Sequence, residues 1–325
     1  MKPTLVLYKT VSSELLEKLQ SQYEVIYFES VNEDNQDEFI KAVQSANVTL
    51  GASVKLGRDV LENAPNLKVI STVSTGIDCF DLDYLNERRI ALMHTPDVLT
   101  ETTADGIFAS LMCSARRTTE LNNLVTSGNW NSGIESEHYG CDVHGKTLGI
   151  LGMGRIGLAI AKRAHFGFGM NIKYYNRSQN QRAEQEFSAQ KLELDDLLQQ
   201  SDFVVSILPS TAQTQNLFTK PQFQLMKPSA IFINGGRGDV VDEDDLTWAL
   251  KNKQIRAAGL DVYRKEPLDK NSELMTLPNA TLFPHIGSAT EETRHAMLIC
   301  AIDNVAAALN GDYSNNCANR NVMES

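Results

Sequence analysis

The sequence predicts an α/β protein built from two doubly wound parallel sheets. Short apolar segments alternate with helical segments along both halves of the 325-residue chain, and this alternation is typical of parallel sheets covered by helices. In addition, segment 147–175 has the pattern of a strand, a glycine-rich turn, a helix and a second strand. That order is typical of a βαβ unit.

Composition limits the class of protein. Hydrophobic residues make up 42% of the chain, and no apolar run approaches the ~20 residues that a membrane helix needs. The first residues, MKPTLVLYKT, lead directly into a strand and leave no room for a signal peptide, so we expect a cytoplasmic protein. The net charge of −11 gives no long-range electrostatic support to binding of nucleic acid or an anionic membrane, and we expect neither partner.

Five scattered cysteines without a C-x-x-C motif are typical of reduced intracellular thiols. His138, Cys141 and His144 form an H-x-x-C-x-x-H pattern that has the residue types of a zinc site. No fourth ligand is evident nearby, and the alternative is a polar loop leading into the next strand. We therefore expect no metal.

The first hundred residues alternate strand and helix. The expected strands are 4–8, 24–28, 48–52, 69–73 and 91–94, and the expected helices are 13–20, 34–45, 58–63 and 82–87. A long helix follows, with Thr100 and Thr103 as a capped start. Apolar positions on nearly all its sides indicate a second burial surface, which favours a dimer. A polar segment, 128–142, then leads to the strand at 147.

The second half resumes the alternation after residue 178. The expected strands are 203–208, 230–234, 257–262 and 281–284, and the expected helices are 194–199, 242–252 and 290–310. The last helix ends at Gly311 and comes too late for another βα unit, so we expect it to pack on the first domain. The predicted domains are residues 1–101 plus 288–325, and residues 102–287.

The glycine-rich turn predicts a dinucleotide site. Gly152, Gly154 and Gly157 form a G-x-G-x-x-G between strand 147–151 and the helix at 156–165. The first glycine allows the tight turn, the second lets backbone approach a pyrophosphate, and the third lets helix and strand pack closely. The phosphates then lie at the positive end of the helix.

The residues after the second strand of this unit predict NADP(H) as the cofactor. NAD-binding proteins place an acidic residue there for the ribose 2′-hydroxyl, whereas this chain has Asn176, Arg177 and Ser178. The Arg177 guanidinium can bind a 2′-phosphate, and Ser178 adds a hydroxyl. The alternative is that Arg177 is a solvated surface charge.

Polar residues follow three consecutive strands of the second domain. Arg237 follows strand 230–234, Asp261 and Glu266 follow strand 257–262, and His285 follows strand 281–284. Because carboxyl ends of parallel strands meet at one edge, these side chains are expected beside the nicotinamide. Single polar residues at strand ends are commonly surface or cap residues, but three complementary types together favour a catalytic site.

Each of these residue types suits hydride transfer to a 2-keto acid. Arg237 can hold the substrate carboxylate and polarise its ketone, and His285 can donate the proton. Glu266 would fix the imidazole tautomer and favour the imidazolium, and Asp261 would orient the nicotinamide amide. The remaining histidines considered are interpreted as structural: His94, His165 and His295.

The first domain is expected to contribute an anion site. In STVSTGID the predicted strand 69–73 runs into Thr75 and Gly76, whose backbone N–H groups could form a small nest for a carboxylate. The alternative is a plain turn before a helix.

Taken together, these motifs resemble the D-isomer-specific 2-hydroxyacid dehydrogenase family. STVSTGID, TETTADGIF, KTLGILGMGRIG, INGGRGDVVDEDDL, AAGLDVYRKEPL and PHIGSAT occur in family order over nearly the whole chain. The resemblance implies a Rossmann cofactor domain inserted into a flavodoxin-like substrate domain, and a homodimer in which the mid-chain segment crosses to the partner. It also implies a catalytic triad of Arg237, Glu266 and His285, and substrate binding by Thr75 and Gly76. The cofactor-lining residues that it implies are Arg155, Ile156, Asn176, Arg177, Pro209, Gly235, Asp261, His285 and Gly287.

Within the family, the segments MHTP, DVHGKTLGI and RAHFGFGM are similar to bacterial reductases of glyoxylate, hydroxypyruvate and 2-ketogluconate. This implies an NADPH-dependent reductase of small 2-keto acids. Two alternatives remain: an NAD-linked dehydrogenase of another substrate such as phosphoglycerate, and a non-catalytic nucleotide sensor like the corepressors of the family. Formate dehydrogenases of the same framework would have Gln in place of Glu266.

Overall fold

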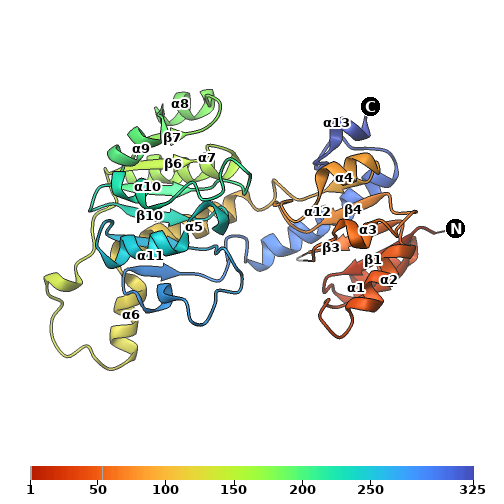
Figure 1. Cartoon of the computed structure of the whole chain (residues 1–325), viewed down its shortest axis with the longest axis horizontal. Coiled ribbons are helices and arrows are strands. Elements are labelled where there is room, and N and C mark those ends of the chain that lie inside the picture. Colours follow the sequence, from red (N-terminus) through yellow and green to blue (C-terminus); the bar gives the residue numbers. More distant parts are fainter. Residues whose placement is uncertain (1, 53) are drawn as a thin grey trace. The chain divides into compact units, whose positions relative to one another are not determined.

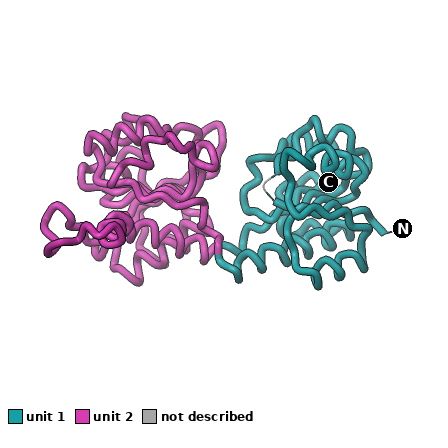
Figure 2. Tube along the Cα trace, turned by 90° about the horizontal axis from the view of Figure 1, so that it is seen from below, with its two compact units in different colours: residues 1–99, 290–325 teal, residues 100–289 magenta. Residues whose placement is uncertain are grey.

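The computed structural model describes residues 2–52 and 54–325. The chain divides into two compact units, unit 1 of residues 1–99 and 290–325 and unit 2 of residues 100–289 (Figure 2). The expected division, after 101 and before 288, differs from this one by two residues at each junction. Each unit is an α/β structure around its own parallel sheet, so the expected fold class is confirmed.

In unit 1, the described residues form a parallel sheet of five strands in the order β2-β1-β3-β4-β5 (Figure 1). This is the flavodoxin-like order of a doubly wound sheet. The strands are β1 (Thr4–Tyr8), β2 (Glu24–Tyr27), β3 (Val48–Gly51), β4 (Val69–Thr72) and β5 (Ala91–Met93). The helices are α1 (Ser13–Gln22), α2 (Gln36–Ser45), α3 (Arg58–Leu61), α4 (Leu82–Glu87), α12 (Glu291–Leu309) and α13 (Arg320–Met323).

Strands β1, β3, β4 and β5 of unit 1 are largely buried, as apolar strands covered by helices on both faces should be, whereas the edge strand β2 has no buried residue. Val6 and Tyr8 of β1 pack with Phe39 of α2 in one hydrophobic cluster. The last long helix, α12, contacts β3, β4 and β5, and Ser71 of β4 donates its hydroxyl to the carbonyl of Ala301, with 2.8 Å between the two oxygens. The final helix therefore packs on the first domain, as expected.

The described part of unit 2 contains a parallel sheet of seven strands in the order β12-β11-β10-β9-β6-β7-β8. The strands are β6 (Thr147–Leu151), β7 (Asn171–Tyr175), β8 (Gln190–Lys191), β9 (Phe203–Ser206), β10 (Ile231–Asn234), β11 (Ala257–Leu260) and β12 (Ala280–Leu282). Chain order reverses between β6 and β9, which pair directly. In open α/β sheets, ligands bind beyond the carboxyl ends of the strands at such a switch point.

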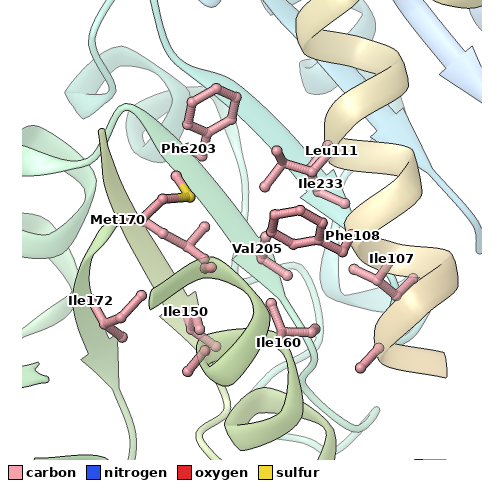
Figure 3. Packing of buried hydrophobic residues seen from close by; sticks show 14 of the residues in the cluster. Ile107, Phe108, Leu111, Ile150, Ile160, Met170, Ile172, Phe203, Val205 and Ile233 are labelled. Carbon is pink, nitrogen blue, oxygen red and sulfur yellow. The ribbon is translucent and has the colours of Figure 1, made fainter. Parts of the chain in front are cut away.

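Two layers of helices cover this sheet. The helices of unit 2 are α5 (Thr100–Arg116), α6 (Thr118–Thr126), α7 (Arg155–Lys162), α8 (Gln181–Phe187), α9 (Leu194–Gln200), α10 (Lys220–Leu225) and α11 (Glu243–Lys251). Helix α6 has no buried residue and belongs to neither layer. On one face, Phe108 of α5 and Ile160 of α7 pack with Ile150 and Val205 of the strands (Figure 3). Phe232 of β10, the neighbour of Ile233, belongs to the hydrophobic cluster on the other face of the sheet, beneath α9, α10 and α11. Alternate residues of the strands thus anchor opposite layers.

Several local predictions were wrong or incomplete. The long helix breaks at Arg117, whose left-handed φ of 55° separates α5 from α6. Thr100 is the first residue of α5, and its buried hydroxyl has no hydrogen-bond partner among the described residues, so it does not cap the helix. The helix expected over 156–165 is α-helical only over Arg155–Lys162 and continues as a π-helical turn at Arg163–Gly167. Helices α8 and α10 and the two-residue strand β8 were not predicted.

Candidate active site

The glycine-rich turn lies between β6 and α7, beside the switch point of the sheet. Gly152 has a φ of 96°, and a Cβ on Gly157 would lie 2.2 Å from the carbonyl oxygen of Gly152. Both positions therefore require glycine. Gly154 is the N-cap of α7, and a Cβ there would meet open space. A bound phosphate would fit at this helix end, because glycine supplies no side-chain acceptor to the first turn.

Segment 176–180 follows β7 and carries the residues expected to select the cofactor. Asn176 is half-buried, and its amide donates to the carbonyl of Ser178 with a nitrogen–oxygen distance of 3.1 Å. Arg177 and Ser178 are exposed. Positions 176–178 contain no carboxylate, so the exposed side chains of this loop are cationic and polar.

The other residues expected to line the cofactor occupy the same unit. Arg155 and Ile156 form the first turn of α7, where they flank the helix end that suits a phosphate. Pro209 is exposed after β9, and Gly235 follows β10, where its N–H donates to the carbonyl of Ser206 at 3.1 Å. These positions lie at carboxyl ends of strands around the switch point.

Arg237 stands on a turn that is fixed by Asn234. Asn234 is 1% exposed; its side chain accepts from the N–H of Gly236 at 3.2 Å and donates to the carbonyl of Arg237 at 3.0 Å. The Arg237 guanidinium also donates to the carbonyl of Gly236 at 2.9 Å. Asn234 was not among the predicted site residues, although its place before the glycine pair in NGGRG was a signal for it.

His285 and Glu266 are in direct contact. Oε2 of Glu266 lies 2.7 Å from Nδ1 of His285, and Oε1 accepts from the N–H of Tyr263 at 3.0 Å. Because an ionised carboxylate only accepts hydrogen bonds, Nδ1 carries a proton. Nε2 is therefore the nitrogen through which this histidine can exchange a proton with a ligand.

The segment around His285 is held from β11. His285 has a left-handed φ of 54°, which costs a non-glycine residue free energy. Beyond it, the Asp261 carboxylate accepts from the N–H groups of Ile286 and Gly287 at 2.7 and 2.9 Å. Before it, the Tyr263 hydroxyl donates to the carbonyl of Phe283 at 2.9 Å. The bonds on both sides stabilise the strained residue.

Asp261 is more deeply engaged in the protein than the sequence indicated. The residue is 3% exposed, and burial raises the pKa of its carboxyl, while the N–H donors of Ile286 and Gly287 and the nearby His285 act in the opposite direction. Both carboxylate oxygens bind backbone of the His285 segment. The structure thus gives Asp261 a role in shaping the His285 segment. This role differs from the contact with a nicotinamide amide that the sequence predicted.

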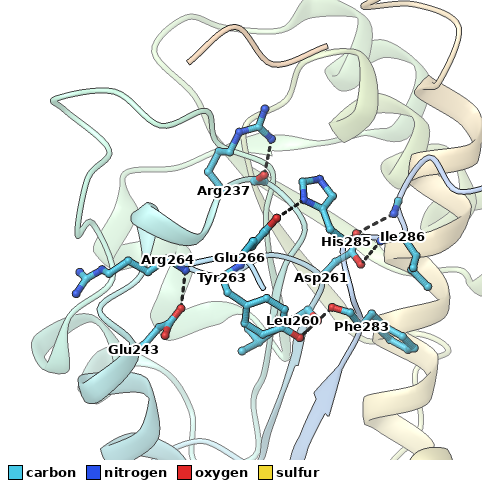
Figure 4. A network of polar contacts seen from close by, with 12 residues as sticks. Arg237, Glu243, Leu260, Asp261, Tyr263, Arg264, Glu266, Phe283, His285 and Ile286 are labelled. Atoms are coloured by element: carbon cyan, nitrogen blue, oxygen red, sulfur yellow. Dashed lines mark hydrogen bonds and ion pairs between the residues drawn. The ribbon is translucent and has the colours of Figure 1, made fainter. Parts of the chain in front are cut away.

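These polar groups lie together at the carboxyl edge of the sheet. Figure 4 shows the guanidinium of Arg237 on the same side as the His285 ring, with Glu266 between the two loops. The loops pack closely, since a Cβ on Gly238 would lie 1.9 Å from the carbonyl carbon of Tyr263. Arg237, Glu266 and His285 therefore come together in unit 2, and the arrangement offers a cation, a carboxylate and an imidazole to one ligand.

In unit 1, Thr75 and Gly76 form a turn that follows β4. The Thr75 hydroxyl donates to the carbonyl of Thr95 at 3.0 Å, and the carbonyl of Thr75 accepts from Nδ1 of His94 at 3.0 Å. Ser74 donates its hydroxyl to the carbonyl of Gly76 at 2.7 Å. His94, for which the sequence indicated no partner, thus supports this turn.

The sequence pattern of His138, Cys141 and His144 raises the possibility of a metal site. Among residues 2–52 and 54–325, no three His, Cys, Asp or Glu side chains are grouped so as to hold a metal ion. Cys141 is held in its loop by a 2.9 Å bond from its N–H to the carbonyl of Ala115.

In the part of the chain that the structure describes, no helix has both the length and the apolar character needed to cross a bilayer.

Comparison with known proteins places these features in a family context. A model of the D-isomer specific 2-hydroxyacid dehydrogenase NAD binding domain matches residues 108–287. Glyoxylate/hydroxypyruvate reductase B of Klebsiella pneumoniae subsp. pneumoniae is 50% identical over 322 residues, which cover 99% of this chain and 100% of the relative. The protein of that name from Serratia proteamaculans is 48% identical over 324 residues, 100% of both chains.

Solved structures give the same picture. A protein from Thermus thermophilus is similar with a TM-score of 0.88 and 36% identity, over 97% of this chain and 99% of that one. The NADPH-dependent glyoxylate/hydroxypyruvate reductase from Sinorhizobium meliloti, in complex with NADP and malonate, has a TM-score of 0.84 and 28% identity, over 98% of each chain.

Proposed function

The chain belongs to the D-isomer specific 2-hydroxyacid dehydrogenase family, and on this premise we propose that it reduces glyoxylate and hydroxypyruvate to 2-hydroxy acids with NADPH. The observation that carries the proposal is the 2.7 Å contact between Glu266 and His285, at the sheet edge that also presents Arg237 (Figure 4). Relatives at 50% and 48% identity that carry the name glyoxylate/hydroxypyruvate reductase B support the choice of substrates.

In the proposed reaction, the nicotinamide supplies a hydride to the carbonyl carbon of the substrate when it is bound. Arg237 binds the substrate carboxylate and polarises the reacting carbonyl through its planar guanidinium. His285 gives the proton on Nε2 to the carbonyl oxygen, so hydride and proton together convert the aldehyde or ketone to a hydroxyl. Glu266 holds the ring through Nδ1 and stabilises the imidazolium before the transfer.

Preference for NADPH is supported by segment 176–178. Arg177 and Ser178 are exposed beyond β7, and no carboxylate there would repel a 2′-phosphate. The related reductase from Sinorhizobium meliloti is NADPH-dependent and was solved with NADP. We propose that Gly154 and the first turn of α7 bind the pyrophosphate and that Arg177 binds the 2′-phosphate.

The turn at Thr75 and Gly76 is proposed to bind the substrate carboxylate with its backbone N–H groups. The carbonyls and the hydroxyl of this turn are already engaged by His94, Thr95 and Ser74. Within residues 2–52 and 54–325, neither of the two N–H groups donates to a backbone carbonyl, so they suit an anion.

We also propose a homodimer formed through segment 117–139. Helix α6 has no buried residue, and it extends away from the rest of unit 2 (Figure 1). Val125, Trp130 and Tyr139 are 54%, 57% and 57% exposed. Large apolar side chains gathered on one protruding segment are typical of an interface.

The test is a panel of 2-keto acids assayed with both reduced cofactors. We expect rapid NADPH oxidation with glyoxylate and hydroxypyruvate and slower oxidation of NADH. Reduction of 2-ketogluconate, which the sequence resemblance includes, is measured in the same panel. NADH-linked activity restricted to a phosphorylated substrate would instead identify the alternative dehydrogenase, and cofactor binding without turnover would identify a nucleotide sensor.

A further inference from the structure

The loop between β7 and α8, residues 176–180, depends on few contacts for its shape. Arg177, Ser178 and Gln179 are exposed, and Asn176 bonds within the loop to Ser178. A phosphate-binding loop that is already ordered binds more tightly, because ordering it on binding costs affinity. The contacts that fix its end at Asn180 therefore decide how well it is prepared.

Asn180 joins this loop to the glycine-rich turn. Its side-chain amide donates to the carbonyl of Met153 with a nitrogen–oxygen distance of 2.7 Å, and Met153 stands between Gly152 and Gly154. Its side-chain oxygen accepts from the N–H of Ala183 at 3.0 Å and so caps α8. Both polar atoms of the side chain thus bind protein, so Asn180 acts on a ligand only through other residues.

A second set of hydrogen bonds joins the loop to β7 and α8. The N–H of Asn180 donates to the Tyr174 hydroxyl at 2.9 Å, and this hydroxyl donates to the Glu184 carboxylate at 2.7 Å. The other oxygen of Glu184 accepts from the Gln179 amide at 2.6 Å. The buried end of β7, the first turns of α8 and the loop are therefore one connected network.

The glycine-rich turn has supports of its own. The N–H of Gly152 donates to the carbonyl of Tyr175 at 3.0 Å, and the N–H of Leu158 donates to the carbonyl of Gly154 at 2.9 Å. Loss of the Asn180 amide leaves both bonds in place. The loop at 176–180, in contrast, loses the one side-chain hydrogen bond that, among the described residues, joins it to the glycine-rich turn.

We propose that Asn180 is a positioning residue for cofactor discrimination: by binding the Met153 carbonyl, it holds Arg177 and Ser178 at a fixed distance from the pyrophosphate site. This inference rests on the proposed preference for NADPH. NADPH places a phosphate on the loop and its pyrophosphate on the glycine-rich turn, so it benefits from the fixed spacing. NADH leaves only a ribose hydroxyl at the loop and gains little from it.

The experiment separates the effect of the bond from Asn180 to Met153 from the effect of capping α8. N180S keeps a good N-cap residue but is too short to reach Met153, whereas N180A loses the cap as well. N180T is a second cap-retaining variant in case N180S folds poorly. Each full-length variant is assayed for kcat and KM with NADPH and NADH, using glyoxylate, and for binding of adenosine 2′,5′-bisphosphate and of 5′-AMP. Melting temperature reports any loss of the cap.

For N180S we expect the NADPH-to-NADH ratio of kcat/KM to fall roughly five- to tenfold, the effect of about one hydrogen bond. The change should be in KM for NADPH, with kcat at saturation retained, and adenosine 2′,5′-bisphosphate should weaken while 5′-AMP does not. An unchanged ratio overturns the inference, and so does equal weakening of both cofactors. A wild-type protein without NADPH preference refutes the proposed cofactor itself, which separates that failure from failure of the Asn180 role.

Discussion

Glu266 and His285, which lie nineteen positions apart on separate loops, meet with 2.7 Å between Oε2 and Nδ1. The contact fixes the ring through one nitrogen and leaves the other for a ligand. The Glu266 carboxylate also accepts from the N–H of Tyr263 through Oε1, so it is oriented before any substrate binds. This pair is the basis for expecting proton transfer at this edge of the sheet.

E266Q tests the electrostatic part of that pair. A glutamine amide can remain in place but carries no negative charge to stabilise an imidazolium, so the upper pH limit of ketone reduction should move to lower pH. The pH profile of kcat/KM measures the change. E273Q, which removes an exposed carboxylate paired with Lys251, should leave the profile in place. A profile that does not move in E266Q would remove this role from Glu266.

R177D tests the cofactor choice. The new carboxylate would repel a 2′-phosphate and could accept from a 2′-hydroxyl, so preference should pass from NADPH to NADH. The ratio of kcat/KM for the two cofactors measures it. R182D makes the same charge change at an exposed residue paired with Glu186 and should keep the original preference. If R177D kept that preference too, Arg177 would be an ordinary surface charge.

His94 should affect substrate binding more than catalysis. H94A removes the donor that holds the Thr75 carbonyl, and we expect the KM for glyoxylate to rise roughly fivefold with kcat nearly unchanged, the loss of about one hydrogen bond. H94N retains an N–H donor and should restore much of the binding. H295A, at an exposed position of α12, serves as the control. Equal KM values in H94A and the wild type would contradict a substrate role for this turn.

The sequence predicted the positions of the strands well, but it did not predict which side chains form hydrogen bonds with one another. Apolar runs such as 147–151 and 231–234 identify buried strands by local pattern, and strand order then brings Arg237 and His285 to one edge. The bond from His94 to Thr75 links residues nineteen positions apart, and no local pattern indicates it. Polar α8 resembles a loop because its helix is stabilised by Asn180 and by contacts made elsewhere in the chain.

The break between α5 and α6 was missed for a related reason. The apolar spacing continues through Arg117, while the backbone there turns left-handed. Arg117 donates to both carboxylate oxygens of Glu120, at 2.8 and 2.7 Å, which fixes the start of α6. Helical periodicity shows which face is apolar but not where the axis changes direction.

Asp202, just before β9 at the amino ends of the strands, is expected to contribute to stability through its charge. Burial raises the pKa of its carboxyl, but Lys227 at 2.7 Å and the N–H of Thr147 at 2.9 Å outweigh this effect, and the pKa is lowered. Stability from such a group is present above the unfolded pKa and is lost as pH falls through the folded one. D202N should therefore lower the free energy of unfolding by about 1 kcal/mol at pH 7.

Denaturant unfolding of D202N and the wild type at pH 7 and near pH 3 checks this prediction. The difference should shrink at the lower pH, since the wild-type carboxyl then becomes protonated. A constant difference would mean that shape at position 202, and not charge, supports the start of β6.

D261N tests the support of the His285 segment. An asparagine oxygen can accept from Ile286 or Gly287, but its amide would face the second N–H. We expect a stability loss of about 1–3 kcal/mol from the unpaired buried donor and a lower kcat, because His285 would no longer be fixed. Melting temperature and steady-state kinetics measure the two effects, and full activity in D261N would show that the segment keeps its shape unaided.

The most direct test of the central claim is multiple-turnover oxidation of NADPH with glyoxylate by the wild type and by H285Q. The wild type should turn over many equivalents of NADPH per active site. H285Q should still bind NADPH and lose on the order of 10² to 10⁴ in kcat, as expected for removal of a general acid. Binding of NADPH without turnover by the wild type, or an H285Q variant with full kcat, would contradict the account.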